Sequence, residues 1–358
     1  MFEALLIRDK VLMIGPLPGK TASGQSICFD ESTKSIKNKV QFNSDFSSWK
    51  NIGVFYLLYP FCAVLFKGPV YFTSSRSARG FLFRDLWILI WAIFSKSKII
   101  NHVHGLEFSS FYKNSTRFVK LLIDYVYSRQ HVIVAPGPEV FKQYCRYKSL
   151  SFHLVPNFFS VSISDLKDKD FTSQYLNVIF LSNLAESKGF IETFEACEIL
   201  YKKGVKIKLH ICGAIIGDNH RSKPEIRKFL SRATEYEFCV FHGFVKGTQK
   251  AKILSSSHVL VLPTSNDFAP LSILDGLASG CFIITTKTGS IPSLLNGFSI
   301  SFVKKERSSI SLALNQYLSL TTSERQKISN HNMRKSHIKY SKIMYLNNIQ
   351  RVITKVGG

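Results

Sequence analysis

The chain repeats one pattern, in which a short run of β-branched and other apolar residues is followed by a longer amphipathic run. The first strand-like runs are residues 11–15, 70–74, 98–105, 131–136 and 152–157. After a polar stretch at 162–174 the pattern restarts, with runs at 177–183, 206–213, 239–245, 258–264, 281–286 and 299–303. Runs such as "KGFIETFEACEILYKKG" lie between them and are expected to be helical. This alternation is typical of parallel sheets covered by helices on both faces.

Two successive sets of strands predict two doubly wound α/β domains, which is consistent with a length of 358 residues. We place the first domain at residues 1–165 and the second at 166–337. The last run, "YSKIMYLNNIQRVITKV", predicts a helix, and we expect residues 338–358 to pack back on the first domain. Ligands of such domains bind at the carboxyl ends of the strands, so we expect those ends to face a central cleft.

The charge balance predicts an anionic partner. Lys and Arg number 47 against 24 Asp and Glu, a net charge of +23. No helix-turn-helix signature, zinc-finger spacing or RNP-type aromatic motif accompanies these cations, so we do not expect nucleic acid as a partner. Anionic lipid and a nucleotide-containing substrate fit the composition better.

Cysteine usage and the first residues predict a cytoplasmic protein. The seven cysteines lie far apart without a C-x-x-C pair, which is typical of free thiols in a reducing compartment. The chain does not begin with the basic segment and long apolar run of a cleavable signal.

Two apolar stretches, residues 54–66 and 86–94, are shorter than the roughly 20 residues that span a bilayer. Their pattern favours core helices. Contact with a membrane surface is the alternative, because aromatic residues and lysines lie next to them.

The glycine-rich segment "IGPLPGKTASGQS" (14–26) contains Gly-Lys-Thr, as a P-loop does. A P-loop has four residues between its first glycine and Gly-Lys-Thr, whereas Gly15 and Gly19 enclose three, and Pro16 and Pro18 have no N–H to donate. The spacing argues against nucleotide-triphosphate hydrolysis. It favours a strand-to-helix turn, with a helix that starts near Gly24 and directs its positive end at a ligand.

In the second domain, "FLSNLAESKGF" places Asn183 and Lys188 at the end of a strand. Lys188 and Gly189 precede a predicted helix, so a cation and helix N–H groups would point the same way, an arrangement that suits a diphosphate. The alternative is a lysine that only extends into solvent.

The stretch "LPTSNDFAPLSILDGLASG" (262–280) carries two carboxylates, Asp267 and Asp275. Their spacing is a little over two helical turns, so both could lie on one helix face and bind the hydroxyls of two rings. Alternatively, Asp267 caps the helix and Asp275 lies on a solvated face. The backbone amides expected near this helix start are those of Phe268, Ala269, Leu271 and Ser272.

In the first domain, "NHVHGLEF" ends a strand with His104 and Gly105. A histidine there could donate to a substrate hydroxyl or phosphate, or transfer a proton. A structural histidine is the alternative.

Taken together and in order, these stretches resemble the retaining glycosyltransferases of the GT-B fold, specifically glycosyltransferase family 4. The matching motifs are "HVHG", "VPN", "SNLAESKG", "ICG", "FHGFV", "LPT" and "APLSILDGLASG". The resemblance spans nearly the whole chain and implies two Rossmann-like domains that face a central cleft. It also implies a hexosyl- or N-acetylhexosaminyltransferase with a nucleotide sugar, a UDP-sugar, as donor.

The resemblance also implies roles for individual residues. Lys188 would neutralise the donor diphosphate, Asp275 would bind the ribose, and Asp267 would contact the transferred sugar. His104 would contact that sugar near its anomeric carbon. The catalytic set is therefore His104, Asp267 and Lys188. The donor-binding set adds Gly24, Asn183, Gly213, Phe244, Val245, Phe268, Ala269, Leu271, Ser272 and Asp275.

The chain departs from the family pattern in three places. Both acids are Asp rather than Glu, Ser182-Asn183 replaces the usual Gly-Arg, and Ala269-Pro270 stands where a glycine is usual. These changes leave Asn266 as an alternative to Asp267. No D-x-D pair ends a strand, so we expect no cofactor and no metal requirement.

For the acceptor, the basic charge and the aromatic-rich apolar stretches indicate a glycan on a lipid diphosphate at an anionic membrane surface. This predicts a bacterial enzyme of O-antigen, lipopolysaccharide, capsule or other surface-polysaccharide biosynthesis, peripheral at the inner face of the cytoplasmic membrane. Two alternatives remain. One is a nucleotide-sugar epimerase, which would need a Tyr-x-x-x-Lys pair and a dinucleotide-type glycine turn. The other is a nucleotide-sugar-binding subunit that has lost turnover.

Overall fold

The computed structural model describes residues 10–18, 23–44, 49–66, 68–75 and 77–357. Two compact units make up the chain. Unit 1 comprises Met1–Asn157 with Ile343–Gly358, and unit 2 comprises Phe158–Lys342. The predicted boundary after residue 165 differs from this division because Phe159 and Val161 already pack into the hydrophobic core of unit 2. At the other end Tyr340, beyond the predicted limit at 337, belongs to the same core.

Unit 1 is built on a parallel six-stranded sheet with the order β2-β1-β3-β4-β5-β6. Its strands are β1 Val11–Gly15, β2 Lys39–Asn43, β3 Val70–Phe72, β4 Ile99–His102, β5 Val132–Ala135 and β6 Ser151–Leu154. The sequence pattern missed β2, "KVQFN". This edge strand alternates polar and apolar residues and buries only Phe42 fully, so it lacks the apolar run that marks the inner strands.

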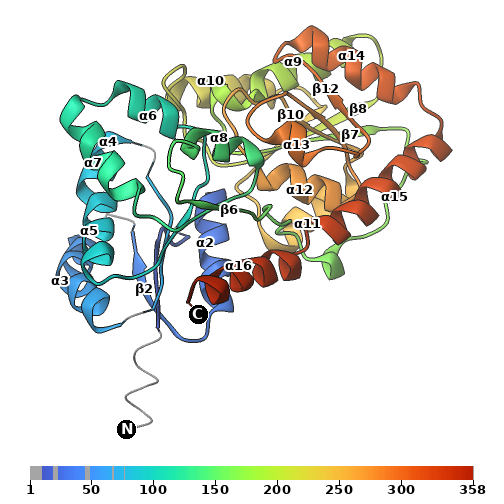
Figure 1. The fold of residues 1–358 in the computed structure, drawn as a ribbon. Helices are drawn as coiled ribbons and strands as arrows, with labels where there is room; N and C mark the ends of the chain where they lie inside the picture. The colour runs from blue at the N-terminus through green and yellow to red at the C-terminus, as the bar shows by residue number, and fades with distance from the viewer. Residues whose placement is uncertain (1–9, 19–22, 45–48, 67, 76, 358) are drawn as a thin grey trace. The chain divides into compact units, whose positions relative to one another are not determined.

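Helices cover both faces of the first sheet, as right-handed crossovers require. One face carries α3 (Trp49–Leu65), α5 (Leu86–Phe94) and α7 (Arg117–Tyr127), and the other carries α2 (Gly24–Ser35) and α16 (Lys342–Gly357) (Figure 1). Shorter helical segments are α4 Ala78–Gly80, η1 Phe81–Asp85, α6 Phe108–Asn114, η2 Pro138–Val140 and α8 Phe141–Tyr144.

Unit 2 is a second parallel six-stranded sheet, with the order β12-β11-β10-β7-β8-β9. Its strands are β7 Leu176–Leu181, β8 Ile207–Cys212, β9 Cys239–Gly243, β10 Val259–Leu262, β11 Phe282–Thr285 and β12 Ile300–Phe302. Its helices are η3 Ile163–Asp165, η4 Glu186–Lys188, α9 Phe190–Lys202, α10 Lys223–Ala233, α11 Gly247–Ser256, α12 Leu271–Ala278, α13 Ile291–Leu294, α14 Arg307–Leu318 and α15 Thr322–Lys339.

The predicted C-terminal helix is confirmed as α16, and it packs within unit 1. Its buried residues Tyr345, Ile349, Val352 and Ile353 recur at helical spacing and form one apolar face. The Tyr345 hydroxyl lies 2.8 Å from the Ser32 hydroxyl and donates to the Cys28 carbonyl at 3.1 Å. One face of α16 is therefore part of the core of the first unit.

We expect Tyr345→Ala to destabilise unit 1 by about 3–5 kcal/mol, because it empties a buried ring site and removes both contacts of the hydroxyl. Tyr345→Phe should cost about 1 kcal/mol. All three tryptophans, at positions 49, 87 and 91, lie in unit 1, so urea unfolding followed by tryptophan fluorescence reports on this unit. The control is Tyr125→Ala on α7, where the ring is half-exposed. Equal stabilities for the two alanine variants would contradict this account of α16.

Candidate functional site

The two central strands of unit 2, β7 and β10, are parallel neighbours at the point where the strand order reverses. The chain continues from β7 to β8 on one side and from β10 to β11 on the other. In doubly wound sheets the loops that leave such a switch point diverge, and ligands bind between them. The loops in question are residues 182–189, after β7, and 263–270, after β10.

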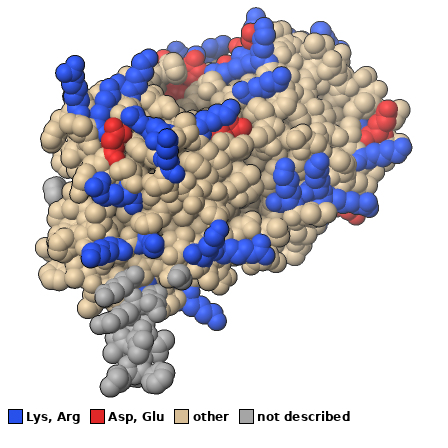
Figure 2. All heavy atoms as spheres, viewed as in Figure 1, with Lys and Arg blue, Asp and Glu red and all other residues tan. Residues whose placement is uncertain are grey.

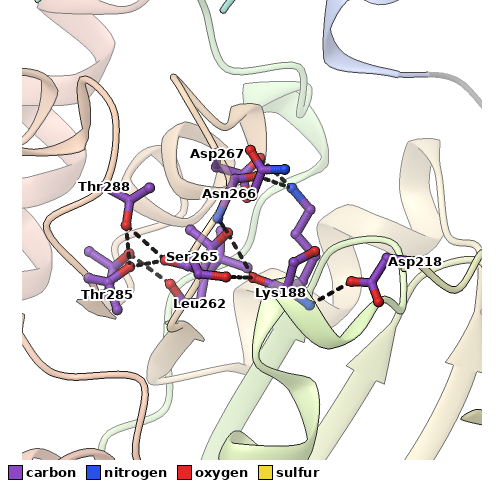
Figure 3. A network of polar contacts seen from close by, with 11 residues as sticks. Lys188, Asp218, Leu262, Ser265, Asn266, Asp267, Thr285 and Thr288 are labelled. Atoms are coloured by element: carbon purple, nitrogen blue, oxygen red, sulfur yellow. Dashed lines mark hydrogen bonds and ion pairs between the residues drawn. The ribbon is translucent and has the colours of Figure 1, made fainter. Parts of the chain in front are cut away.

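Lys188 and Asp267 meet across these two loops (Figure 3). The Lys188 ammonium donates to Asp267 Oδ1 at 2.7 Å and to the backbone oxygen of Asn266 at 2.7 Å. Both side chains are about one-fifth exposed, so the pair borders solvent. Asp267 Oδ2 is buried and receives no hydrogen bond from any residue that the structure describes. The site thus combines a cation with a carboxylate oxygen that lacks a donor.

Backbone and hydroxyl contacts hold the two loops together. The Ser187 carbonyl accepts from the Ser265 N–H at 2.8 Å, from the Ser265 hydroxyl at 3.1 Å and from the Thr264 hydroxyl at 3.3 Å. The Thr264 carbonyl accepts in turn from the hydroxyls of Thr286 and Thr288, which follow β11. Three successive loops at one edge of the sheet are therefore linked through two carbonyl groups.

Asp218, in the loop after β8, supports the same edge. Its carboxylate accepts from the backbone N–H group of Ser187 at 2.8 Å (Figure 3). It also accepts from the backbone N–H groups of His220 at 3.0 Å and Arg221 at 3.1 Å. Burial raises the pKa of this carboxyl, but the hydrogen bonds from Ser187, His220 and Arg221 outweigh it and lower the pKa to about 2. Asp218 is thus a stable anion that fixes the position of the Lys188 turn.

Two glycines allow close backbone approach at this edge. Gly189 has φ +80°, and a Cβ there would lie 2.5 Å from the Pro263 ring. Gly213 has φ +156°, and a Cβ would lie 1.8 Å from the Ser182 carbonyl oxygen, next to Asn183. The structure thus explains both glycines by contact between loops.

Helix α12 starts at Leu271, with Pro270 as its N-cap and no side-chain cap among the described residues. The first-turn amides of Leu271 and Ser272 therefore lie at the carboxyl edge of the sheet, after half-buried Phe268 and Ala269. Asp267 lies in the preceding loop. The expectation that Asp267 and Asp275 share one helix face was therefore wrong, as was the alternative of Asp267 as the cap. The helix begins only after Pro270, because proline disfavours helical backbone at the residue that precedes it.

Asp275 is buried and engaged on all sides. Its Oδ1 accepts from the N–H groups of Ser160 at 2.5 Å and Val161 at 2.9 Å, and its Oδ2 accepts from the Lys250 ammonium at 2.8 Å. The Ser160 hydroxyl lies 3.0 Å from Oδ2. The exposed fractions of the Lys250 and Asp275 side chains are 13% and 4%. In this structure Asp275 ties the first residues of unit 2 to α11 and α12.

The remaining donor-site candidates lie in several places. In unit 2, half-exposed Phe244 and buried Val245 follow β9, where Gly243 accepts a backbone hydrogen bond from Gly213. Gly24, in unit 1, is the first residue of α2, and its neighbours Ser23 and Ser26 form a capping box. Residues 19–22 of the glycine-rich turn lie outside the described residues.

His104 lines a small pocket of unit 1, at the carboxyl ends of β3 and β4. The pocket is lined by Ser74, Ser75, Val103, His104, Gly105, Glu107, Phe108 and Tyr144. The turn at its rim is held by buried Asp85, which accepts from the Ser75 N–H at 2.7 Å and pairs with Arg84 at 2.7 Å. Burial raises the pKa of Asp85, and the Arg84 charge opposes this.

Sequence reasoning missed several residues that shape these sites. Asp218, Lys250 and Ser160 stand in no motif, and each has a partner, Ser187 or Asp275, that is 25 to 115 residues away in sequence. Glu107 stood inside the quoted "NHVHGLEF" but was not singled out. An acid so close to the His-Gly turn in sequence could have been recognised as a candidate. In the structure its carboxylate lies against Gly105.

Comparison with known proteins identifies unit 2. Residues 164–336 match the family model described as "Glycosyl transferases group 1". This region is therefore similar to that glycosyltransferase family. We call residues 164–336 the group 1 domain after that model, and they contain the loops of Lys188 and Asp267. No curated protein matches the chain.

Solved structures show that the whole chain has the GT-B fold of these enzymes. The Anabaena protein HepE in complex with UDP and glucose is 10% identical, with a TM-score of 0.71 over 97% of this chain and 100% of its own. A glycosyltransferase from Rickettsia africae is 12% identical, with a TM-score of 0.72 over 97% and 98%. An Escherichia coli structure titled trehalose-6-phosphate, bound with UDP-2-fluoro glucose, is 10% identical, with a TM-score of 0.69 over 98% and 99%.

The Asp275 contacts predict a large structural cost when the acid is lost from the group 1 domain. Asp275→Ala leaves a buried ammonium and two backbone N–H groups without their acceptor, and should destabilise unit 2 by about 3–5 kcal/mol. Lys250→Met should lower the stability of unit 2 by less, because the N–H groups of Ser160 and Val161 still donate hydrogen bonds to the Asp275 carboxylate. In a double-mutant cycle the two changes should couple by more than about 1 kcal/mol, measured by circular dichroism in urea. Additive effects would show that the pair does not stabilise the fold.

Proposed function

We propose that the protein is a retaining glycosyltransferase that moves a hexosyl or N-acetylhexosaminyl group from a UDP-sugar to a glycan acceptor. The contact between Lys188 and Asp267 carries the proposal. It places a cation and a carboxylate oxygen without a donor at the switch point of a group 1 domain. A nucleotide sugar has the complementary groups, an anionic diphosphate next to a ring of hydroxyls.

Lys188 is suited to a diphosphate because its ammonium has three N–H donors, and the structure gives two of them acceptors. We assign the third donor to a phosphate oxygen. The Asp267 oxygen that lacks a donor would accept from a hydroxyl of the transferred sugar. Asn266 is exposed, and its backbone oxygen rather than its side chain contacts Lys188, so we assign the first-acid role to Asp267.

The other assignments follow the family resemblance. Phe244 and Val245 would border the base, next to the loops of Asn183 and Gly213. The amides of α12 would approach the phosphates. We assign His104 and its pocket to the sugar that is transferred and to the acceptor. HepE with UDP and glucose, and the E. coli protein with UDP-2-fluoro glucose, support UDP as the nucleotide.

In the mechanism we propose, transfer with retention needs no protein nucleophile. The bond between the sugar and the diphosphate breaks, the acceptor oxygen attacks from the same face, and the departing diphosphate takes the acceptor proton. Lys188 and the α12 amides would stabilise the charge that develops on the diphosphate. This chemistry uses the cation of the protein, so we propose a reaction independent of metal ions and cofactors.

Asp275 is assigned to the ribose by resemblance, yet its oxygens already accept from Ser160, Val161 and Lys250. The ribose could be bound only if some of these contacts open. The Asp and Asn183 departures from the family pattern support a second candidate function, a nucleotide-sugar-binding subunit with little or no turnover. Release of UDP from a UDP-sugar by the purified protein separates the two candidates.

For the acceptor we propose a glycan on a lipid diphosphate, at the inner face of a bacterial cytoplasmic membrane, in surface-polysaccharide biosynthesis such as that of O-antigen or capsule. The net charge of +23 supports an anionic membrane as the place of action.

We expect Lys188→Ala to lower kcat/KM for donor turnover by about 100-fold or more, as loss of a transition-state charge partner does. Asp267→Asn should lower turnover while the protein stays folded, because a partly exposed ion pair contributes about 1 kcal/mol or less. The measurement is UDP release from UDP-glucose and UDP-N-acetylglucosamine. Addition of a metal chelator should leave the rate of UDP release unchanged.

The matched control is Lys203→Ala, an exposed lysine that follows α9. Asn266→Ala should also keep wild-type turnover. If Lys188→Ala turned over like Lys203→Ala, the assignment would be wrong. If Asn266→Ala lost activity while Asp267→Asn kept it, the first-acid role would belong to Asn266.

A further inference from the structure

Helix α3 is apolar on its outer side as well as on the side that covers the sheet. Phe55, Tyr59 and Ala63 are fully buried against unit 1. The opposite side is exposed from Val54 to the end of the helix, at positions 54, 57, 58, 61, 64 and 65, all Val, Leu or Phe. Phe61 is 74% exposed. Surface helices of water-soluble proteins normally carry polar residues on that side.

The neighbouring helices continue the same surface. In η1 and α5, Phe83, Ile90 and Phe94 are exposed at a spacing of seven and four residues, which places them on one side of the helix. In α7, Phe118, Leu121 and Tyr125 are exposed at a spacing of three and four. We call the outer side of α3, α5 and α7 the apolar face. Contiguous apolar surface of this kind marks an interaction site.

Cations flank these helices in the sequence. Arg79 precedes η1, Lys96 and Lys98 follow α5, Lys113 and Arg117 lie at the end of α6 and the start of α7, and Arg129 follows α7; all are exposed. Two acids of this part of the chain, Asp85 and Asp124, bind other residues of unit 1. Asp85 is buried with Arg84, and Asp124 accepts from the hydroxyls of Tyr112 and Tyr147. Figure 2, viewed as Figure 1, shows the visible part of this side as mostly uncharged, with blue side chains and few red ones.

We propose that the apolar face is a bilayer-contact surface that lies in the interface of an anionic membrane. A bilayer offers acyl chains to the exposed Leu and Phe side chains and anionic headgroups to the surrounding cations. None of the described helices combines the length and hydropathy that spanning a membrane requires. In this proposal the helices lie parallel to the membrane plane.

A second copy of the chain fits the face less well. A symmetric dimer through this face would bring the same cations of both copies together, and α3 and α5 contain no acid to neutralise them. The group 1 domain provides an internal comparison. Its large exposed apolar residues, such as Leu312 on α14, are spread over separate elements.

This proposal deepens the proposed function, because it names the surface by which an enzyme of lipid-linked acceptors would reach the membrane. The chain is suited to a direct test. Two of its three tryptophans, Trp87 and Trp91, lie in α5 with partly exposed side chains. Quenching of tryptophan fluorescence by brominated phospholipid therefore reports contact of the apolar face itself with acyl chains.

The experiment measures flotation and fluorescence quenching of the full chain with phosphatidylcholine vesicles, with and without phosphatidylglycerol. Wild type should bind the anionic vesicles and be quenched. At about 1 M salt, where the Debye length falls to about 3 Å, part of the binding should remain. Leu57→Glu with Phe61→Glu should lower the partition coefficient at least about tenfold and abolish the salt-resistant part. Leu312→Glu, at 61% exposure in unit 2, should behave like wild type.

UDP binding by thermal shift is measured for every variant. It shows that each variant is folded, and it separates failure of this proposal from failure of the donor site. Unquenched wild type, or equal partitioning of Leu57→Glu/Phe61→Glu and wild type, would overturn the proposal. A dimer that forms without lipid and dissociates in the Leu57→Glu/Phe61→Glu variant would also overturn it. The apolar face would then bind a second copy of the chain.

Discussion

The parallel pairing of β7 with β10 is the constraint on which the candidate site depends. Because the two strands are neighbours and run in the same direction, the loops that follow them begin side by side, although some 80 residues separate them in sequence. The Ser265 N–H donates to the Ser187 carbonyl, and the Ser187 N–H donates to the Asp218 carboxylate. These two hydrogen bonds fix the loops against each other. Lys188 and Asp267 meet as a consequence of this topology.

The charges at this edge are arranged for exchange of partners. Lys188 is neutralised by Asp267, at a depth where both side chains still border solvent. An arriving diphosphate would find the cation already oriented, and little desolvation would remain to be overcome. Asp275, by contrast, is enclosed by Ser160, Val161 and Lys250. The two acids that sequence spacing treats as a pair therefore differ in environment. Asp267 borders solvent, whereas Asp275 is buried among hydrogen bonds that stabilise the fold.

Much of this fold could be predicted from the sequence, because buried parallel strands are apolar runs and the helices between them are amphipathic. Strand β2 was missed since an edge strand needs no such run. The turn of Lys188 and Gly189 and the start of α2 at Gly24 were predicted from local chemistry alone. The partners of Asp218 and Asp275 could not be, because contacts between distant loops leave no local pattern. The apolar face was predicted only as the alternative to core helices, since "VFYLLYPFCAVLF" favours a core helix unless the side that the sheet leaves uncovered is known.

The central claim is that the loops after β7 and β10 bind the diphosphate of a nucleotide sugar. Hydrogen–deuterium exchange of the full chain with and without UDP tests it most directly, because the backbone amides of both loops report on occupancy whether or not the enzyme turns over. The account predicts slower exchange in peptides that cover residues 183–190 and 264–274. Protection confined to other segments at saturating UDP, with these two loops unchanged, would contradict it.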